Sequence, residues 1–229
     1  MECSAEFSFH GHVFVPLPDG GLYWPARRAL LLADLHLEKA SWFARRGQML
    51  PPYDSDATLA AVDRLVRLTD PAEIWCLGDS FHDEDGPARL DAYARAQLEQ
   101  LMRGRSWTWI VGNHDTVPRS LAAGEVASEV RLDGLLLRHE AGRAETAPEI
   151  SGHFHPKWRV RLRGRSISRR CFVLGENRLI LPAFGAFTGG LDARHPVITS
   201  LFTNDAQILM PIEGRLLRFA LPAGRSVRQ

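Results

Sequence analysis

The chain has 229 residues, of which 45% are hydrophobic and 24% are charged, and its formal net charge is +1. A chain of this length and composition can bury one sizeable core, so we expect a single domain over residues 1–229 rather than two small ones. No run of eighteen apolar residues occurs, and the first residues lack the basic and then apolar profile of a signal peptide. We therefore expect neither a membrane-spanning segment nor a signal peptide.

The cysteines indicate the redox compartment. Cys3, Cys76 and Cys171 are odd in number and stand far apart in the chain. This usage does not suggest a disulfide scaffold, which secreted domains of small size commonly have. We therefore expect a reduced, cytoplasmic protein.

The first two-thirds of the chain alternates apolar runs with helical patterns. The apolar runs cover residues 29–33, 74–77 and 107–111. Each is followed by a segment with polar residues, which begins at Asp34, Gly78 and Gly112 respectively. Between them, residues 55–68 and 89–102 carry apolar side chains at helical spacing. Buried strands that alternate with helices predict a mainly parallel sheet, with the polar residues at the carboxyl ends of its strands.

Beyond Gly152 the pattern changes to short strand-like runs separated by turn residues. We expect strands at residues 171–174, 179–181, 197–202 and 216–219. Several strands at this spacing predict a second sheet that packs on the first.

Five short clusters of metal-binding residue types follow the expected strands in a fixed order. Carboxylate, imidazole and amide ligands suit Mn, Fe or Zn, and no cysteine lies in a cluster. One such pair alone means little, but five of them can supply ligands to two adjacent divalent ions. The clusters are Asp34-Leu35-His36, Gly78-Asp79, Gly112-Asn113-His114-Asp115, His139, and Gly152-His153-Phe154-His155.

This order resembles the motifs of the calcineurin-like metallophosphoesterase superfamily, which run D-x-H, G-D, G-N-H-D/E, H and G-H-x-H. The resemblance implies an α/β fold in which a two-sheet β-sandwich is flanked by helices, the four-layer metallophosphoesterase fold. It also implies a metal-dependent phosphoesterase with two divalent metal ions whose ligand sets share Asp79. The implied sets are Asp34, His36, Asp79 and His155 for one ion, and Asp79, Asn113, His139 and His153 for the other.

The resemblance and the chemistry of two ions together suggest a mechanism. Two ions about 3.5–4 Å apart can hold a hydroxide between them as nucleophile and clamp the phosphate oxygens. His114 follows a ligand but is not itself a ligand in the family, and we expect it to protonate the leaving oxygen as general acid. Asp115 is expected to hold that imidazole in its charged form, because a neighbouring carboxylate favours the cation.

The charge is unevenly distributed along the chain. Residues 1–150 hold 15 basic and 23 acidic side chains, a net charge of −8, whereas residues 151–229 hold 13 basic and 4 acidic ones, a net charge of +9. Arg159, Arg161 and Arg163 alternate with apolar residues at strand period, so we expect them to project from one face. A row of guanidinium groups suits nucleic acid, although an ordinary solvated face is the alternative. His82 is likewise open between a contact with the substrate, a contact with the metal ligands, and a place in a solvated acidic loop.

A closer resemblance covers nearly the whole chain. Residues 34–39, 78–83, 152–156 and 181–190 look like the ligase-associated DNA damage response endonucleases, the PdeM group. This implies a Mn-dependent phosphodiesterase or endonuclease that acts on nucleic acid (DNA or RNA) in bacterial DNA repair. It also implies a functional association with a DNA ligase, a helicase and an exonuclease.

Two other classes of function keep the same motifs. A phosphomonoesterase that acts on nucleotides or phosphoproteins needs the same metals, because these read only the phosphate. A non-catalytic interaction module is also known on this fold. His114 argues against such a module, because a scaffold does not need a proton donor beside a complete ligand set.

Overall fold

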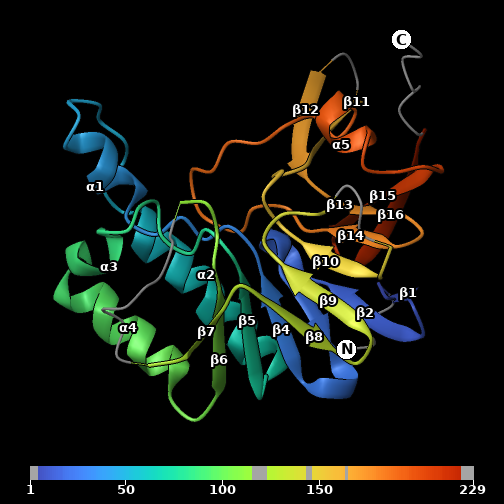
Figure 1. Ribbon diagram of the computed structural model, residues 1–229. Coiled ribbons are helices and arrows are strands. Elements are labelled where there is room, and N and C mark those ends of the chain that lie inside the picture. Colours follow the sequence, from blue (N-terminus) through green and yellow to red (C-terminus); the bar gives the residue numbers. More distant parts are fainter. Residues whose placement is uncertain (1–4, 115–122, 143–145, 163–164, 223–229) are drawn as a thin grey trace.

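The computed structural model describes residues 5–114, 123–142, 146–162 and 165–222 (Figure 1). Two sheets pack face to face, and the longer helices cover the outer face of the first sheet (Figure 1). The fold is thus mixed α/β with two large sheets flanked by few helices, as the sequence predicted.

The first sheet contains the parallel strands that the apolar runs predicted. Strands β4 to β7 pair in parallel, and β1 to β4 are joined antiparallel. The two short 3-10 turns η1 (Pro18–Gly20) and η2 (Pro25–Arg27) flank β3. In spatial order the strands are β1 (Phe7–Phe9), β2 (His12–Pro16), β3 (Leu22–Trp24), β4 (Ala29–Leu32), β5 (Glu73–Leu77), β6 (Ser106–Ile110) and β7 (Glu125–Ala127).

Helices α2 (Asp54–Thr69) and α4 (Ala92–Met102) bury their apolar faces against this sheet, through Leu59 and Val62 of α2 and Leu98 of α4. Helix α4 begins three residues later than predicted, because the Asp91 carboxylate accepts a hydrogen bond from the backbone N–H of Ala94 and caps the helix there. The shorter helices α1 (Lys39–Ala44) and α3 (Gly86–Arg89) lie beyond the strand ends. No helix in the described part of the chain is long and apolar enough to cross a membrane.

The second sheet packs on the first through a shared apolar core, to which Leu31 and Leu77 contribute from one side and Ile150, Leu179 and Leu209 from the other. Strand β10 pairs in parallel with β9 and β14, and the other neighbours are antiparallel. In spatial order the strands are β16 (Arg215–Leu221), β15 (Ala206–Ile212), β13 (Phe172–Leu174), β14 (Arg178–Ile180), β10 (Glu149–Ser151), β9 (Leu135–Arg138) and β8 (Glu129–Leu132).

One predicted strand is wrong. Residues 197–202 were expected to extend the second sheet, but the chain forms the short helix α5 (Pro196–Thr199) there. Pro196 occupies the first turn, where its fixed φ suits a helix, and the His195 ring accepts a hydrogen bond from the backbone N–H of Val197 at 3.3 Å. Ile198 is buried in the core on the outer side of the second sheet. The cap therefore outweighs the strand propensity of the β-branched residues.

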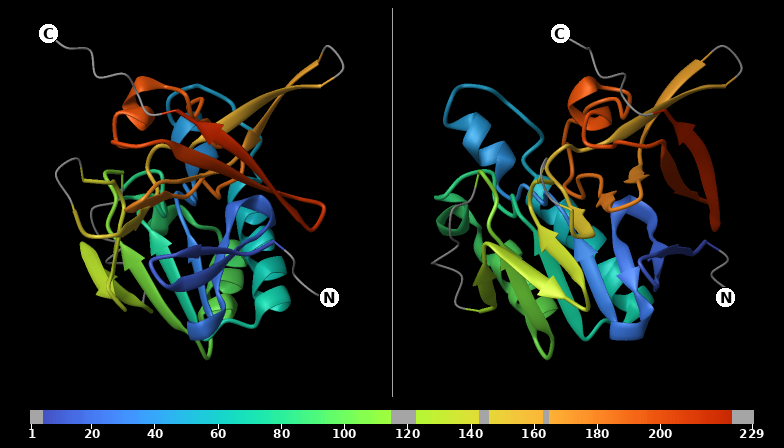
Figure 2. Two further views of the ribbon diagram at one scale, coloured as in Figure 1. Left: turned by 90° about the vertical axis from the view of Figure 1, so that its right-hand side faces the viewer. Right: turned by 45° about the vertical axis from the view of Figure 1, so that its right-hand side comes forward.

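Strands β11 (Lys157–Leu162) and β12 (Arg165–Arg170) form a hairpin that extends away from both sheets (Figure 2). Its register places Lys157 opposite Arg170 and Arg159 opposite Ser168. Trp158 anchors the base of the hairpin, because its side chain is buried in the core on the outer side of the second sheet.

Candidate metal centre

The candidate ligands lie at the carboxyl ends of strands from both sheets. Asp34 follows β4, Asp79 follows β5 and Asn113 follows β6, all in the first sheet. His139 and His153 follow β9 and β10 of the second sheet. Since the two sheets face each other, these strand ends bring residues far apart in the sequence into one site.

The first group of donor atoms contains Asp34, His36 and His155, whose ligand atoms lie within 4.8 Å of one another. His155 Nε2 is 3.3 Å from Asp34 Oδ1 and 3.4 Å from His36 Nε2. Two imidazole nitrogens this close must share a proton or a cation, since two lone pairs repel. Oxygen and nitrogen donors in this arrangement fit a divalent transition ion.

The second group contains Asn113, His139 and His153. Asn113 Oδ1 is 2.7 Å from His139 Nε2 and 3.1 Å from His153 Nδ1, and these two ring nitrogens are 3.1 Å apart. The other nitrogen of His139, Nδ1, lies 3.1 Å from the carbonyl of Leu77. A hydrogen bond donated there leaves the Nε2 lone pair directed at the group, which is how metal-binding histidines are usually oriented.

The buried carboxylate of Asp79 lies between the two groups. Its Oδ2 is 3.9 Å from His36 Nε2, and its Oδ1 is 3.5 Å from His139 Nε2. The backbone N–H of His114 donates to Oδ1 at 2.9 Å and fixes the carboxylate. Each oxygen thus faces a different group, which is the arrangement that a bridging ligand requires.

Several candidate ligands have a backbone that L-residues rarely adopt. Outside glycine, a left-handed φ is uncommon and costs about 1–3 kcal/mol for each residue. Such residues persist where the surrounding structure holds them, and they gather at functional sites. The φ angles are 54° for Asp34, 45° for His36, 46° for Asp79, 69° for His153 and 47° for His155.

Burial lowers the pKa of three histidines in and beside the two donor groups. Desolvation, followed by the neighbouring His155 and His82, lowers the pKa of His36 to about 2. Desolvation, followed by the charge of Lys39, lowers the pKa of His82 to about 4. Desolvation and then His139 lower the pKa of His153. A neutral imidazole has a lone pair to offer, so the shifts at His36 and His153 suit metal ligands.

His114 lies at the mouth of the candidate site, with a side chain that is 44% exposed. Its Nδ1 is 3.2 Å from the carbonyl of His82, and its Nε2 is 4.0 Å from Asp79 Oδ2. The carbonyl of His82 therefore orients the ring, a contact that no residue type in the sequence could reveal. Asp115, the expected partner of His114, lies outside the described residues.

The side chain of His82 lies behind His36 and not at the open face. It is 8% exposed, and its Nδ1 is 3.4 Å from His36 Nδ1. Trp42 and Phe43 of α1 contact the His82 ring at centroid distances of 4.8 and 5.6 Å, and His114 stacks on it at 5.2 Å. The sequence analysis missed this aromatic group, although Trp42 and Phe43 stand close to the D-x-H motif.

The predicted arginine row is only partly described. Arg159 is exposed on β11. Arg161 belongs to the same strand, but its side chain and the whole of Arg163 lie outside the described residues. The hairpin begins at Lys157, two residues after His155, so its base adjoins the first donor group.

Gly185 stabilises the loop that carries the first donor group, because its backbone N–H donates to the carbonyl of Asp34 at 3.1 Å. A Cβ at this position would lie 2.1 Å from the carbonyl oxygen of Leu35. We therefore expect Gly185→Ala to displace the Asp34 loop, lower the midpoint of thermal unfolding and reduce bound metal. Gly189→Ala is the matched control, since a Cβ there would meet nothing within 4 Å. Equal metal contents in the two variants would contradict this role.

Comparison with known proteins identifies the family. The family model described as calcineurin-like phosphoesterase matches residues 27–164. The chain belongs to this family. It is therefore a metal-dependent phosphoesterase, and the resemblance indicated by the five motifs is confirmed. Two overlapping sets of donor atoms, Asp34 with His36 and His155 and Asp34 with Asp79 and His139, each lie within 4.8 Å of one another and suit the divalent metal ions of a dimetal phosphoesterase.

A solved structure extends the likeness beyond the family model. This chain is 32% identical to the Pseudomonas putida nuclease MPE. The match covers 93% of this chain and 98% of that one, and the TM-score is 0.72. No curated protein matches the chain.

Proposed function

We propose that this phosphoesterase is a phosphodiesterase that cuts nucleic acid internally, as an endonuclease. The observation that carries the proposal is the basic hairpin that starts two residues after His155. A backbone of many phosphates can contact the metal centre and the hairpin at once, whereas a small phosphomonoester cannot. The likeness to a nuclease over nearly the whole chain supports the same substrate.

The proposed ligands are the members of the two donor groups together with Asp79. Asp34, His36, Asp79 and His155 would hold one ion, and Asp79, Asn113, His139 and His153 would hold the other. When bound, two divalent ions stabilise charge on the phosphate and lower the pKa of a bound water. We propose manganese, because nitrogen and oxygen donors without thiolate suit it, with iron or zinc as alternatives.

The proposed proton donor is His114. Its Nδ1 donates to the carbonyl of His82, so Nε2 faces the substrate and carries the proton for the leaving oxygen. The exposure of the ring allows it to exchange that proton with solvent between turnovers. Asp115 is proposed to favour the charged form of the ring.

Aromatic side chains near the centre also suit a nucleic acid. Trp42 and Phe43 are half-buried beside His82, and the exposed rings of Tyr53 and Phe187 contact each other at 5.6 Å. Phe187 lies two residues after Gly185, which supports the Asp34 loop. Aromatic faces stack with bases of every kind, so such a surface favours nucleic acid without sequence preference.

The resemblance to the ligase-associated endonucleases supports a role in bacterial DNA repair. We include in the proposal a functional association with a DNA ligase, a helicase and an exonuclease. Co-purification of the native protein with these enzymes after DNA damage would test it.

A substrate panel with manganese tests the reaction class. We expect hydrolysis of a small phosphodiester reporter and of single-stranded or duplex nucleic acid, with a phosphomonoester reporter cleaved poorly. Preference for the monoester would favour the phosphomonoesterase. Full metal occupancy without hydrolysis of any substrate would favour the interaction module.

The arginine row gives a second test of the same proposal. Replacement of Arg159, Arg161 and Arg163 by Gln is expected to weaken nucleic-acid binding and to reduce the salt slope by about two to three, one for each lost phosphate contact. Hydrolysis of the small diester is expected to fall much less, because it is too short to reach the hairpin. Unchanged binding and salt dependence would mean that the row is only a solvated face.

A further inference from the structure

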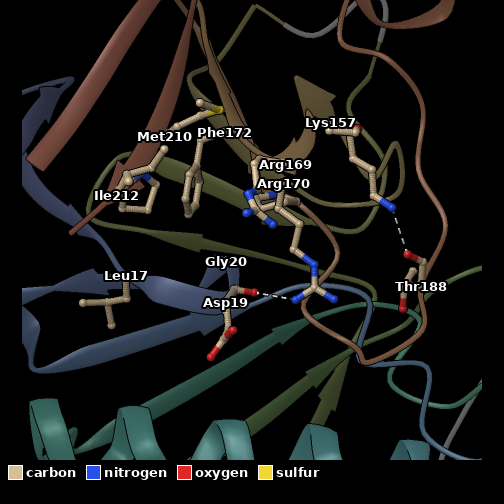
Figure 3. A pocket seen from close by; sticks show the side chains of 13 residues that line it. Leu17, Asp19, Gly20, Lys157, Arg169, Arg170, Phe172, Thr188, Met210 and Ile212 are labelled. Atoms are coloured by element: carbon tan, nitrogen blue, oxygen red, sulfur yellow. Dashed lines mark hydrogen bonds between the residues drawn. The ribbon is translucent and has the colours of Figure 1, made fainter. Parts of the chain in front are cut away.

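A cavity of about 520 Å³ lies at the base of the hairpin, between the η1 turn, strand β15 and residues 182–188 (Figure 3). Its volume is in the range of small-ligand sites. One end is polar, with the cations Lys157, Arg169 and Arg170 and with Thr188 (Figure 3). The other is apolar, with Phe172, Met210 and Ile212.

The polar end has an excess of positive charge. The guanidinium of Arg170 donates to the backbone carbonyls of Asp19, Phe184 and Gly185, and Lys157 Nζ donates to the carbonyl of Thr188 at 3.2 Å (Figure 3). Neither Lys157 nor Arg170 forms an ion pair with a carboxylate in the described part of the chain. The Asp19 carboxylate, which also lines the cavity, is bound by Arg64 at 2.9 Å.

The strand register sets two of these positive charges opposite each other. Lys157 and Arg170 are directly opposite each other across the β11–β12 pair. Two like charges in such positions destabilise a sheet, and partial burial reduces the screening by water. A bound anion would remove this repulsion, because it would contact both cations. Two residues further along the hairpin, Arg159 lies opposite Ser168, and this pair continues the polar surface toward solvent.

The cavity is joined to the metal centre by a short path. Arg170 binds the carbonyl of Gly185, and the N–H of the same glycine donates to the carbonyl of Asp34 at 3.1 Å. Lys157 is two residues from His155 along the chain. The backbone of Gly185 therefore links the cavity to the first donor group, and none of the candidate metal ligands is among the residues that line the cavity.

We propose that the polar end of this cavity, formed by Lys157 and Arg170, binds a phosphate group of the nucleic-acid strand outside the bond that is cut. The apolar end then accommodates part of the adjoining nucleotide. The identity of the strand rests on the proposed function, whereas the affinity for phosphate rests only on the cavity. Inorganic phosphate is the other source of the same chemistry.

The first arm of the test measures binding of a labelled single-stranded DNA to the metal-loaded protein at several salt concentrations. Lys157→Gln is expected to weaken binding about tenfold and to reduce the salt slope by about one, because one phosphate contact is lost. Lys157→Arg keeps the charge and is expected to restore most of the affinity. Arg103→Gln removes an exposed cation at the end of α4 and serves as the control, with no expected change.

The second arm uses inorganic phosphate and the midpoint of thermal unfolding of the same proteins. Ligand that binds only the folded state raises this midpoint. The rise caused by phosphate is expected to be smaller in Lys157→Gln than in the control variant. Comparison of the two variants removes the contribution of phosphate at the metal centre, which both retain.

The outcomes separate the two proposals. If Lys157→Gln matches the control in both arms, the cavity proposal is overturned. If only the phosphate-dependent rise is lost, the cavity binds free phosphate and the assignment to the strand is overturned. If the unmodified protein hydrolyses the small diester but neither binds nor cuts nucleic acid, the proposed function and the strand assignment fail, and the phosphate arm still decides the anion site.

Discussion

Replacing Asp79 by alanine is expected to remove both metal ions and abolish hydrolysis. The two oxygens of this carboxylate face different donor groups, so the change takes a ligand from each proposed ion site at once. By contrast, His36→Ala and Asn113→Ala each remove a ligand from one group only. Elemental analysis of the purified variants measures the difference.

The controls for this prediction are the two single-group variants, which should keep more metal than Asp79→Ala. Two retained ions per chain in Asp79→Ala would contradict the bridging role. Because Asp79 is buried, folding of each variant must be checked by circular dichroism, so that loss of metal is not confused with loss of fold.

Replacing His114 by alanine is expected to lower turnover by about 10²–10⁴, the usual contribution of a positioned acid. Metal content and substrate affinity should remain, because His114 is not among the proposed ligands. The loss should be much smaller for a nitrophenolate leaving group, which needs no proton. Turnover of diesters with good and poor leaving groups measures this contrast.

Equal losses on the two leaving groups would show that His114 supports structure instead. His82→Asn is a useful companion variant, because it retains the backbone carbonyl that orients His114 while it removes the ring that packs against His36 and stacks on His114. It should therefore change metal binding more than it changes the dependence on leaving group.

The positions of the motifs were predictable because two kinds of sequence signal agree. Apolar runs located β4, β5 and β6, and metal-binding residue types followed each run. The parallel arrangement of these strands then requires their ends to meet at one edge. The metal identity and the domain extent over residues 1–229 remain predictions.

Other features depend on contacts that a single sequence does not encode visibly. The carbonyl of His82 binds His114 whatever the side chain at that position, so no residue type could indicate it. The run at 197–202 has strand propensity, and its helix results from a local cap and burial. Two residues that line the cavity, Asp19 and Arg170, are distant in the sequence, and they meet because the Arg170 guanidinium donates to the backbone carbonyl of Asp19. The arginine-rich segment was visible, but the opposition of Lys157 and Arg170 needed the register of the hairpin.

The origin of the proposed ligands from both sheets has a mechanical consequence. Asp34 and Asn113 end strands of the first sheet, and His139 and His153 end strands of the second. Ions held between them would cross-link the two layers at one edge, much as a disulfide links two strands. Because the ions bind the folded chain, a chelator should lower the unfolding midpoint and loosen the contact between the sheets first at that edge. Hydrogen exchange at β4 and β10, with and without chelator, would show whether the sandwich depends on its cofactor to stay closed.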